Sequence, residues 1–321
     1  MTNNEQYKLL CEQHTDIPLF LQYWWMETVC EGKRWDVLLY CDANGNVEAA
    51  MPFLIGKKYG FRYIFQPQLT QYSGIWYATK EFRTNNDRLS FEKHVINKFV
   101  DDLAKLKLSG FRQNFPPQFT NWLPFSWHGF EQTTRYTYQI GDLADTDKVF
   151  SNFDRNRRQK KILSLQNDYQ ATTDITPDQL FDFHSQYWKS RGSKDYFDKE
   201  LVTHLCQTAI ARGQGFIMGL ADKVSNEIVA MRFVVFDSRV AYSLLSAIKP
   251  GTSVNGLSEL LFWKVIQELS DKVQVFDFEG SMDEGIEHSY RLYGAEQVPY
   301  FQITKRYNPL FWALLRLKGV K

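Results

Sequence analysis

The pattern of apolar and polar residues near position 40 predicts a β-hairpin. An apolar run ends at Asp42, the polar segment Asp-Ala-Asn-Gly-Asn follows, and a second apolar run extends from Val47 to Phe53. Within the polar segment, Asn44 and Gly45 readily adopt the positive φ angles that a tight turn between antiparallel strands requires. We therefore expect two strands joined at this turn.

A second hairpin pattern lies in the other half of the chain and repeats the first. It runs from Phe216 to a turn at Ser225-Asn226 and returns through Ile228 to Phe236. The corresponding residues are Asp42, Asn46, Ala50, Met51 and Phe53 in the first pattern and Asp222, Asn226, Ala230, Met231 and Phe233 in the second. The matching turn and the shared Ala-Met-x-Phe segment favour duplication of one structural unit.

Helical patterns accompany both hairpins in the same order. A short helical stretch precedes each hairpin, with Gln22-Tyr23-Trp24 before the first and Gln186-Tyr187-Trp188 before the second. A long amphipathic helix follows each, over 89–107 and 257–269, where apolar residues recur every three or four positions. The pattern predicts an α/β (α+β) chain of two tandem domains, each a mixed β-sheet flanked by helices.

A polar segment without strand character, Gly141 to Asp147, separates the two halves. We expect an N-terminal domain over 1–145, a C-terminal domain over 146–306 and an amphipathic tail over 307–321. The tail combines apolar and aromatic residues with basic ones, so it could make peripheral contact with a membrane surface or dock as a terminal helix. We favour docking.

Bulk composition narrows the class of protein. The 321 residues suffice for two domains, and 44% hydrophobic with 23% charged residues is typical of a globular chain. The net charge of +1 excludes a global field that would attract DNA. We find neither a secretion signal nor an apolar run of about 20 residues, which predicts a cytoplasmic protein.

Cysteine and histidine residues are scattered without the spacing of metal ligands, so we expect no metal site. The cysteines are Cys11, Cys30, Cys41 and Cys206, and the six histidines include His14, His128, His184 and His288. There is also no Gly-x-Ser-x-Gly segment and no Cys/His pairing, which disfavours a hydrolase with a nucleophilic triad.

Three motifs resemble the FemAB-like proteins of the GNAT acyltransferase superfamily. They are Pro67–Gly74 (PQLTQYSG), the basic run Asn156–Ile162, and Phe276–Ser281 followed by Tyr290–Ala295. The resemblance extends over about residues 17–305. It implies two GNAT-like domains and transfer of an acyl or aminoacyl group onto an amine, as in cell-wall synthesis. The acceptor would be a small-molecule or lipid-linked envelope precursor in a cleft between the domains.

The donor implied by the resemblance is acyl-CoA or aminoacyl-tRNA, with no tightly bound cofactor. The loop from Lys249 to Gly256 departs from the (Gln/Arg)-x-x-Gly-x-(Gly/Ala) pattern of CoA-binding members. The charged coiled-coil insertion of many tRNA-using members is also missing. Both donors therefore stay open.

Two carboxylates are the candidate catalytic residues. Asp277 and Glu279 are alternate residues of a strand predicted over 273–279, so both should project from one face. Neighbouring carboxylates can raise the pKa of one of them toward neutrality, which would let Glu279 accept the proton of an ammonium group. Alternatively, one of them caps the following turn or pairs with Arg291.

Further candidates would hold the substrates. By resemblance or by their polar groups, the candidates for the acceptor or for anionic groups are Arg291, Ser281, Arg191, Tyr196, Gln71 and Tyr72. Candidates for the donor lie in the loop before the second amphipathic helix, whose N–H groups favour anions, and in the preceding strand, whose backbone would contact the carbonyl oxygen. They are Lys249, Gly251, Asn255, Gly256 and Leu245.

The strongest local positive charge is the run Arg155, Arg157, Arg158, Lys160 and Lys161. It could attract the phosphates of tRNA or of a precursor. A solvated helix face is the favoured interpretation, because no aromatic residues interleave to stack on bases. A second hypothesis for the whole chain is a noncatalytic tandem binder of an envelope precursor or a protein partner, which the unusual donor loop would suit.

Overall fold

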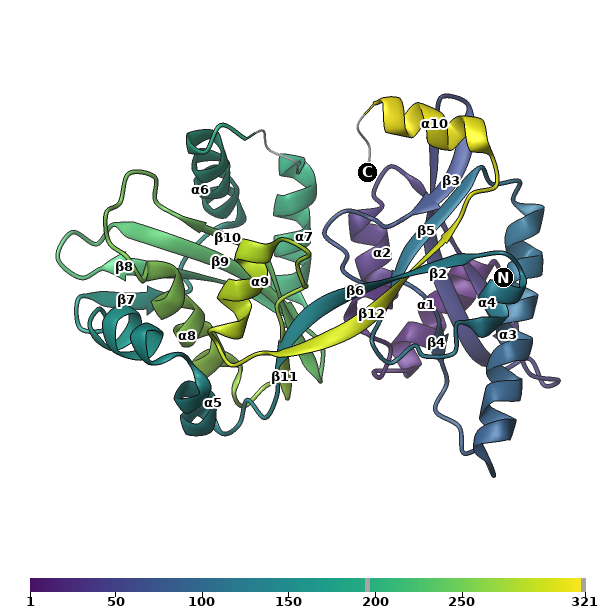
Figure 1. Ribbon diagram of the computed structural model, residues 1–321, viewed down its shortest axis with the longest axis horizontal. Helices are drawn as coiled ribbons and strands as arrows, with labels where there is room; N and C mark the ends of the chain where they lie inside the picture. The colour runs from purple at the N-terminus through teal and green to yellow at the C-terminus, as the bar shows by residue number, and fades with distance from the viewer. Residues whose placement is uncertain (194–196, 319–321) are drawn as a thin grey trace. The chain divides into compact units, whose positions relative to one another are not determined.

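The structure, a computed structural model, describes residues 1–193 and 197–318 and contains two compact units (Figure 1). Unit 1 comprises Met1–Arg135 and Pro299–Lys321, and unit 2 comprises Tyr136–Val298. The chain passes from unit 1 to unit 2 within strand β6 (Glu131–Ile140) and returns within β12 (Glu296–Lys305). The boundaries differ from those of the expected domains. Residues 136–145, expected in the N-terminal domain, belong to unit 2, and the tail belongs to unit 1.

Unit 1 is a mixed sheet flanked by helices. Its strands follow the order β1-β2-β3-β5-β12, in which β3 and β5 are parallel and the other pairs are antiparallel. The remaining elements are α1 (Asn3–Gln13), α2 (Tyr23–Val29), β1 (Arg34–Cys41), β2 (Val47–Lys58), β3 (Phe61–Phe65), β4 (Trp76–Tyr77), α3 (Asn85–Lys105), β5 (Gly110–Phe115), α4 (Leu123–Trp127) and α10 (Pro309–Leu317), with a 3-10 turn over Leu19–Leu21.

Unit 2 has the same kind of sheet, in the order β6-β11-β10-β9-β8-β7, with β10 and β11 parallel. Helices α6 and α7 cover one face, and α5 and α8 lie on the other (Figure 1). The elements are α5 (Thr146–Asn152), the π-helix η2 (Arg157–Leu163), β7 (Tyr169–Thr172), α6 (Pro177–Ser190), α7 (Lys199–Ala211), β8 (Gly215–Asp222), β9 (Ile228–Phe236), β10 (Val240–Ile248), α8 (Leu257–Leu269), β11 (Val275–Asp277) and α9 (Glu284–Arg291).

Both predicted hairpins are confirmed, and their turns are built in the same way. Strands β1 and β2 pair antiparallel, as do β8 and β9. In the first turn the Asp42 carboxylate accepts two backbone N–H groups at 2.8 Å, and in the second Asp222 accepts two at 2.8 and 2.9 Å. The positive φ angles fall on Gly45 (89°) and Asn226 (58°). In each turn the aspartate side chain accepts hydrogen bonds from N–H groups of the same turn. Because this interaction is local, it can be predicted from the sequence.

The order of elements is also the same in both units. Each has a hairpin, a third antiparallel strand, an amphipathic helix and a further strand that pairs parallel to the third. The helices α3 and α8 supply the apolar faces of the two cores, for example Phe99 in unit 1 and Phe262 in unit 2, both fully buried. The predicted fold class, two mixed sheets flanked by helices, is confirmed.

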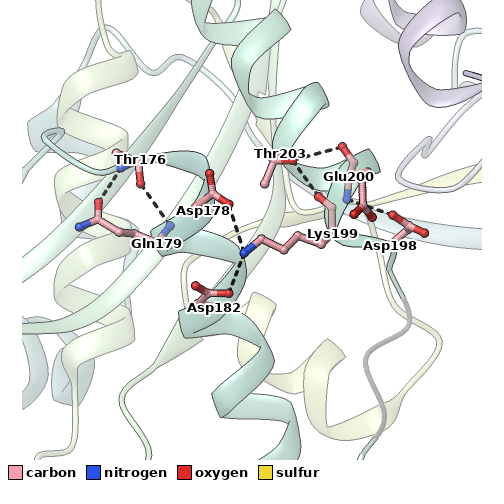
Figure 2. Close-up of polar contacts among 8 residues, drawn as sticks. All are labelled: Thr176, Asp178, Gln179, Asp182, Asp198, Lys199, Glu200 and Thr203. Carbon is pink, nitrogen blue, oxygen red and sulfur yellow. Dashed lines mark hydrogen bonds and ion pairs between the residues drawn. The ribbon is translucent and has the colours of Figure 1, made fainter.

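An ion-pair cluster joins the start of α7 to the first turns of α6 (Figure 2). The Lys199 Nζ atom lies 3.1 Å from Asp178 and 3.2 Å from Asp182. A capping box between Thr176 and Gln179 fixes the beginning of α6 in addition. The N-terminal ends of the two helices are therefore held together.

The C-terminal helix α10 docks on unit 1, as favoured from the sequence. Phe311 is fully buried, and its ring lies 5.5 Å from the ring centroids of both Phe61 and Tyr63 on β3. Leu315, one turn later, is also buried. Across the described part of the chain, we find no helix with the length and apolarity that a bilayer crossing demands.

Candidate active site

Two parallel strands of unit 2 separate where the candidate catalytic residues lie. β10 and β11 pair only from Val240 opposite Val275 to Tyr242 opposite Asp277. Beyond this point β11 ends, whereas β10 continues and its pairing with β9 shifts register between Ser243 and Leu245. This bulge leaves one residue of β10 out of the ladder. Backbone groups near Leu245 therefore lie at the point of separation, and their contact with a donor carbonyl stays a prediction.

Asp277 is a fully buried acceptor that closes the end of β11. Its carboxylate accepts the Thr137 hydroxyl, the Gln139 side-chain amide at 2.8 Å and the backbone N–H of Glu279 at 2.7 Å. The last bond confirms the alternative in which one carboxylate caps the following turn. Asp277 therefore positions the chain around Glu279.

The expectation that Asp277 and Glu279 lie on one face of a strand is wrong. β11 ends at Asp277, and Glu279 has a φ of 63°. The physical reason is the Asp277 cap, which bends the backbone, together with Gly280, where an added Cβ would lie 2.4 Å from the Tyr136 carbonyl oxygen. The chain turns here instead of extending, and a non-glycine residue in the left-handed region is a strained feature typical of functional sites.

Glu279 combines burial with an unfilled acceptor. Its Oε1 atom is buried, and within residues 1–193 and 197–318 it has no hydrogen-bond partner. Burial, and secondly the nearby Asp277 carboxylate, raise the pKa of Glu279 well above its ordinary value, because both disfavour the charged form. Such a carboxyl group at a strand end can exchange a proton with a substrate that approaches it.

Arg291 ends α9, as predicted, and remains largely exposed. Its Nε atom pairs with Glu287 at 2.7 Å, and Glu287 in turn accepts the Tyr138 hydroxyl at 2.9 Å. Ser281 lies in the turn before this helix, where its hydroxyl accepts the N–H of Asp283 at 3.0 Å. Arg291 thus belongs to the same segment as Glu279, and its ion pair with Glu287 orients its guanidinium group.

The predicted donor loop connects β10 to α8. Lys249 forms an ion pair with Glu227, and Gly251 and Asn255 are exposed. Gly256, at the start of α8, is buried with a φ of 113°, and the backbone of Lys161 lies against it. The π-helix that carries the basic run therefore packs on the beginning of α8. The role of this loop in donor binding stays a prediction.

We predict that Gly256→Ala destabilises unit 2 by about 2–4 kcal/mol. The new Cβ would lie 2.6 Å from the Lys161 carbonyl oxygen, and an alanine is strained at this φ. Gly251→Ala is the matched control, since its φ of 79° adds similar strain but nothing lies within 4 Å. Thermal denaturation of both variants measures the difference; equal losses would contradict the close packing of η2 on α8.

The other predicted residues lie apart from this cluster along the chain. Gln71 and Tyr72 belong to unit 1, where Tyr72 is buried and packs edge-on against Tyr300 with ring centroids 5.2 Å apart. Arg191 is exposed at the end of α6, with its guanidinium 4.9 Å from the ring centroid of Tyr187. Tyr196 lies outside the described residues.

Two buried arginines of unit 2 were not predicted as site residues. Arg157 lies within the basic run that was interpreted as a solvated face, and Arg232 lies in strand β9. For Arg232 a signal was available, because it is the single charged residue in the apolar segment Ile228–Phe236. A charge in such a strand needs a compensating partner.

Known proteins resemble the chain in fold. Residues 152–290, within unit 2, match the acetyltransferase (GNAT) domain family. No curated protein sequence matches the chain. The crystal structure of FemX is similar over 99% of this chain and 98% of its own, with a TM-score of 0.70 and 12% identity.

Two further solved structures have the same fold. L-PGS from Bacillus licheniformis has a TM-score of 0.55 and 12% identity over 92% of this chain and 95% of its own. A tandem GNAT protein from the clavulanic acid biosynthesis pathway has a TM-score of 0.53 and 11% identity over 87% and 85%. The chain therefore has the tandem GNAT fold, as its FemAB-like motifs predicted, and its residues 152–290 match the acetyltransferase (GNAT) domain family.

Proposed function

We propose that this protein transfers an acyl or aminoacyl group from an activated donor to an amine acceptor, with a cell-envelope precursor as the class of acceptor. The observation that carries the proposal is Glu279, a half-buried residue where β10 and β11 separate, whose Oε1 atom is buried without a hydrogen-bond partner among the described residues and whose pKa is raised. The match to a GNAT domain supports acyl transfer as the class of reaction.

In this proposal Glu279 handles the proton of the acceptor. An ammonium group that approaches the carboxyl group stabilises its charged form, so Glu279 releases its proton to water, and the carboxylate then takes a proton from the ammonium. The free amine attacks the donor carbonyl carbon and forms the new C–N bond. The bond to the leaving sulfur or oxygen breaks, and the leaving group takes up a proton.

Backbone N–H groups at the β10 bulge are the proposed partners of the carbonyl oxygen. They lie near Leu245, beyond the last parallel pair with β11. Donors aimed at the position where negative charge develops stabilise the tetrahedral intermediate. No side chain needs to form a covalent bond with the acyl group.

Product formation with defined donors tests this function. The protein is incubated with acetyl-CoA or aminoacyl-tRNA and with primary-amine precursors of the cell envelope, and the mass of the acceptor is measured. We expect the acceptor to gain the mass of one acyl or aminoacyl group. If the protein consumes none of the donors faster than buffer does, and if it binds the acceptor in the absence of a donor, the noncatalytic binder is favoured.

We predict that Arg291→Ala lowers kcat/KM about tenfold or more, because a charged side chain that pairs with an anionic substrate group contributes about 1.5–3 kcal/mol. Arg291 is exposed and makes one helical ion pair, so folding stability should change by less than about 0.5 kcal/mol. Arg212→Ala, an exposed arginine at the end of α7, is the control. An unchanged kcat/KM would remove Arg291 from the site.

A further inference from the structure

Arg157 is buried without a counter-ion. It lies in the π-helix η2 and is 5% exposed. Its Nη2 atom donates to the Ser289 hydroxyl at 2.8 Å, and the guanidinium lies 4.0 Å from the ring centroid of Tyr293. Its Nε and Nη1 atoms are buried and have no acceptor among the residues that the structure describes. Among the described residues, no carboxylate lies within ion-pair distance of it.

Arg232 is a second buried arginine of unit 2. It projects from β9 and is 8% exposed. Its Nη1 atom donates to the hydroxyl of Ser243 at 2.8 Å, on β10 just beyond the last residue paired with β11. The Nε atom is buried without an acceptor. For this arginine too, the described part of the chain offers no carboxylate within 4.0 Å.

The two guanidinium groups belong to one cluster. Arg232 lies 5.4 Å from the ring centroid of Phe262, and the rings of Phe262 and Tyr293 are 4.5 Å apart. Burial raises the pKa of Tyr293, the positive charges of both arginines oppose that rise, and the charge of the Glu259 carboxylate, which also acts on Arg232, adds to it. Both charges are therefore felt at Tyr293, on the side of the sheet that α8 covers.

Such an arrangement is costly without an anion. An arginine side chain keeps its proton in proteins, so it cannot escape burial by becoming neutral. Each buried N–H group without an acceptor costs about 1–3 kcal/mol. Arg157 Nε, Arg157 Nη1 and Arg232 Nε are donors of the kind that a group with several oxygens and more than one negative charge accepts from. A phosphate has both, and arginine forks match its geometry.

We propose that Arg157 and Arg232 bind a phosphate group of the acyl donor. The proposal rests on the proposed function for the identity of the ligand, since the phosphate would come either from the diphosphate of an acyl-CoA or from the 3′ end of an aminoacyl-tRNA. The position supports it, because Ser243, the partner of Arg232, is adjacent in sequence to the β10 bulge where the carbonyl is proposed to lie.

Inorganic pyrophosphate is the probe, with sodium chloride added to keep ionic strength constant. Isothermal calorimetry of the full chain should detect one pyrophosphate per protein, and pyrophosphate should raise its Tm. Arg157→Met and Arg232→Met should weaken this binding about tenfold or more, because each removes a charge-assisted contact. Arg155→Met is the matched control, since Arg155 is exposed in the same basic run, and it should keep the full response.

Stability without pyrophosphate separates ligand binding from a structural role. Removal of an uncompensated buried charge should leave the Tm of each methionine variant unchanged or higher. A lower Tm with an undiminished pyrophosphate response would overturn the proposal, because the arginines would then serve packing alone. If a variant does not fold, calorimetry of the unaltered protein still decides: absence of pyrophosphate binding would refute the site.

Two further titrations identify the source of the phosphate. Coenzyme A and a short RNA hairpin with a single-stranded CCA end are compared in the unaltered protein and in Arg157→Lys, which keeps the charge but loses the fork. The ligand whose affinity falls in the variant is the donor class, and failure of both would overturn the assignment to a donor. If pyrophosphate binds but no acyl transfer occurs, the proposed function is wrong and the phosphate site stands. If acyl transfer occurs but pyrophosphate does not bind, the phosphate site is wrong and the proposed function stands.

Discussion

Glu279→Gln should reduce kcat about 100-fold or more while the protein stays folded. Glutamine keeps the shape of the side chain but cannot take a proton, and general base catalysis typically contributes a factor of about 10²–10⁴. The loss should appear in kcat more than in KM, because the proton moves only in the transition state. Steady-state kinetics of product formation measure it.

The control for this variant is Glu284→Gln, an exposed carboxylate in the first turn of α9. It makes the same glutamate-to-glutamine change in the same segment but leaves Glu279 in place, so its kcat should equal that of the unaltered protein. A Glu279→Gln protein with full turnover would refute the proton-transfer role, whatever the outcome for the phosphate site.

The pH dependence of stability gives the same variant a second readout. The pKa of Glu279 is raised in the folded state, so the folded protein binds a proton at this residue more tightly than the unfolded chain does. The stabilising effect is complete below the unfolded pKa of about 4.3 and is lost as pH rises through the folded pKa. Glu279→Gln should remove this decline and be as stable as the unaltered protein, or more so, at neutral pH in chemical denaturation.

Asp277→Ala should have the largest effect on stability, a loss of about 3 kcal/mol or more. The substitution leaves the donors of Thr137, Gln139 and Glu279 without their shared acceptor in a fully buried position. Each unsatisfied buried group costs about 1–3 kcal/mol. For a chain of this size the Tm should fall by roughly 6 °C or more. Urea denaturation gives the free energy directly.

Asp277→Asn distinguishes the cap from the charge. Asparagine keeps the oxygen that accepts from Thr137 and Glu279, so we expect a loss of only about 1 kcal/mol. Because the Asp277 carboxylate helps to raise the pKa of Glu279, its neutralisation should shift the rising limb of the pH–rate profile to lower pH. If both variants match the unaltered protein in stability, Asp277 is not the cap that the geometry indicates.

Local patterns in the sequence were enough to predict the repeated architecture. In the hairpin turns, Asp42 and Asp222 accept hydrogen bonds from backbone N–H groups of their own turns. The helix over 257–269 follows from its own apolar periodicity. These features depend on residues close together in the chain, so a single sequence reveals them. The FemAB-like motifs are also short local segments, and the fold that they predicted is the one that the chain shares with FemX.

The site could be predicted only in part, because its decisive contacts join distant segments. Glu279 was named, but its turn depends on the Asp277 cap and on the backbone of Tyr136. Arg155 and Lys160 are exposed, as a solvated face requires, whereas Arg157 is buried against Ser289 and Tyr293 of a much later segment. No periodicity within the basic run distinguishes that one arginine from its neighbours.

The path of the chain through β6 and β12 has a consequence for synthesis on the ribosome. Strand β5 of unit 1 pairs with β12, which is translated only after all of unit 2. Until then, the nascent N-terminal portion exposes an open sheet edge, a surface prone to aberrant association. Unit 2 is one continuous segment and can assemble during that interval, so the half of the molecule begun first is the half finished last.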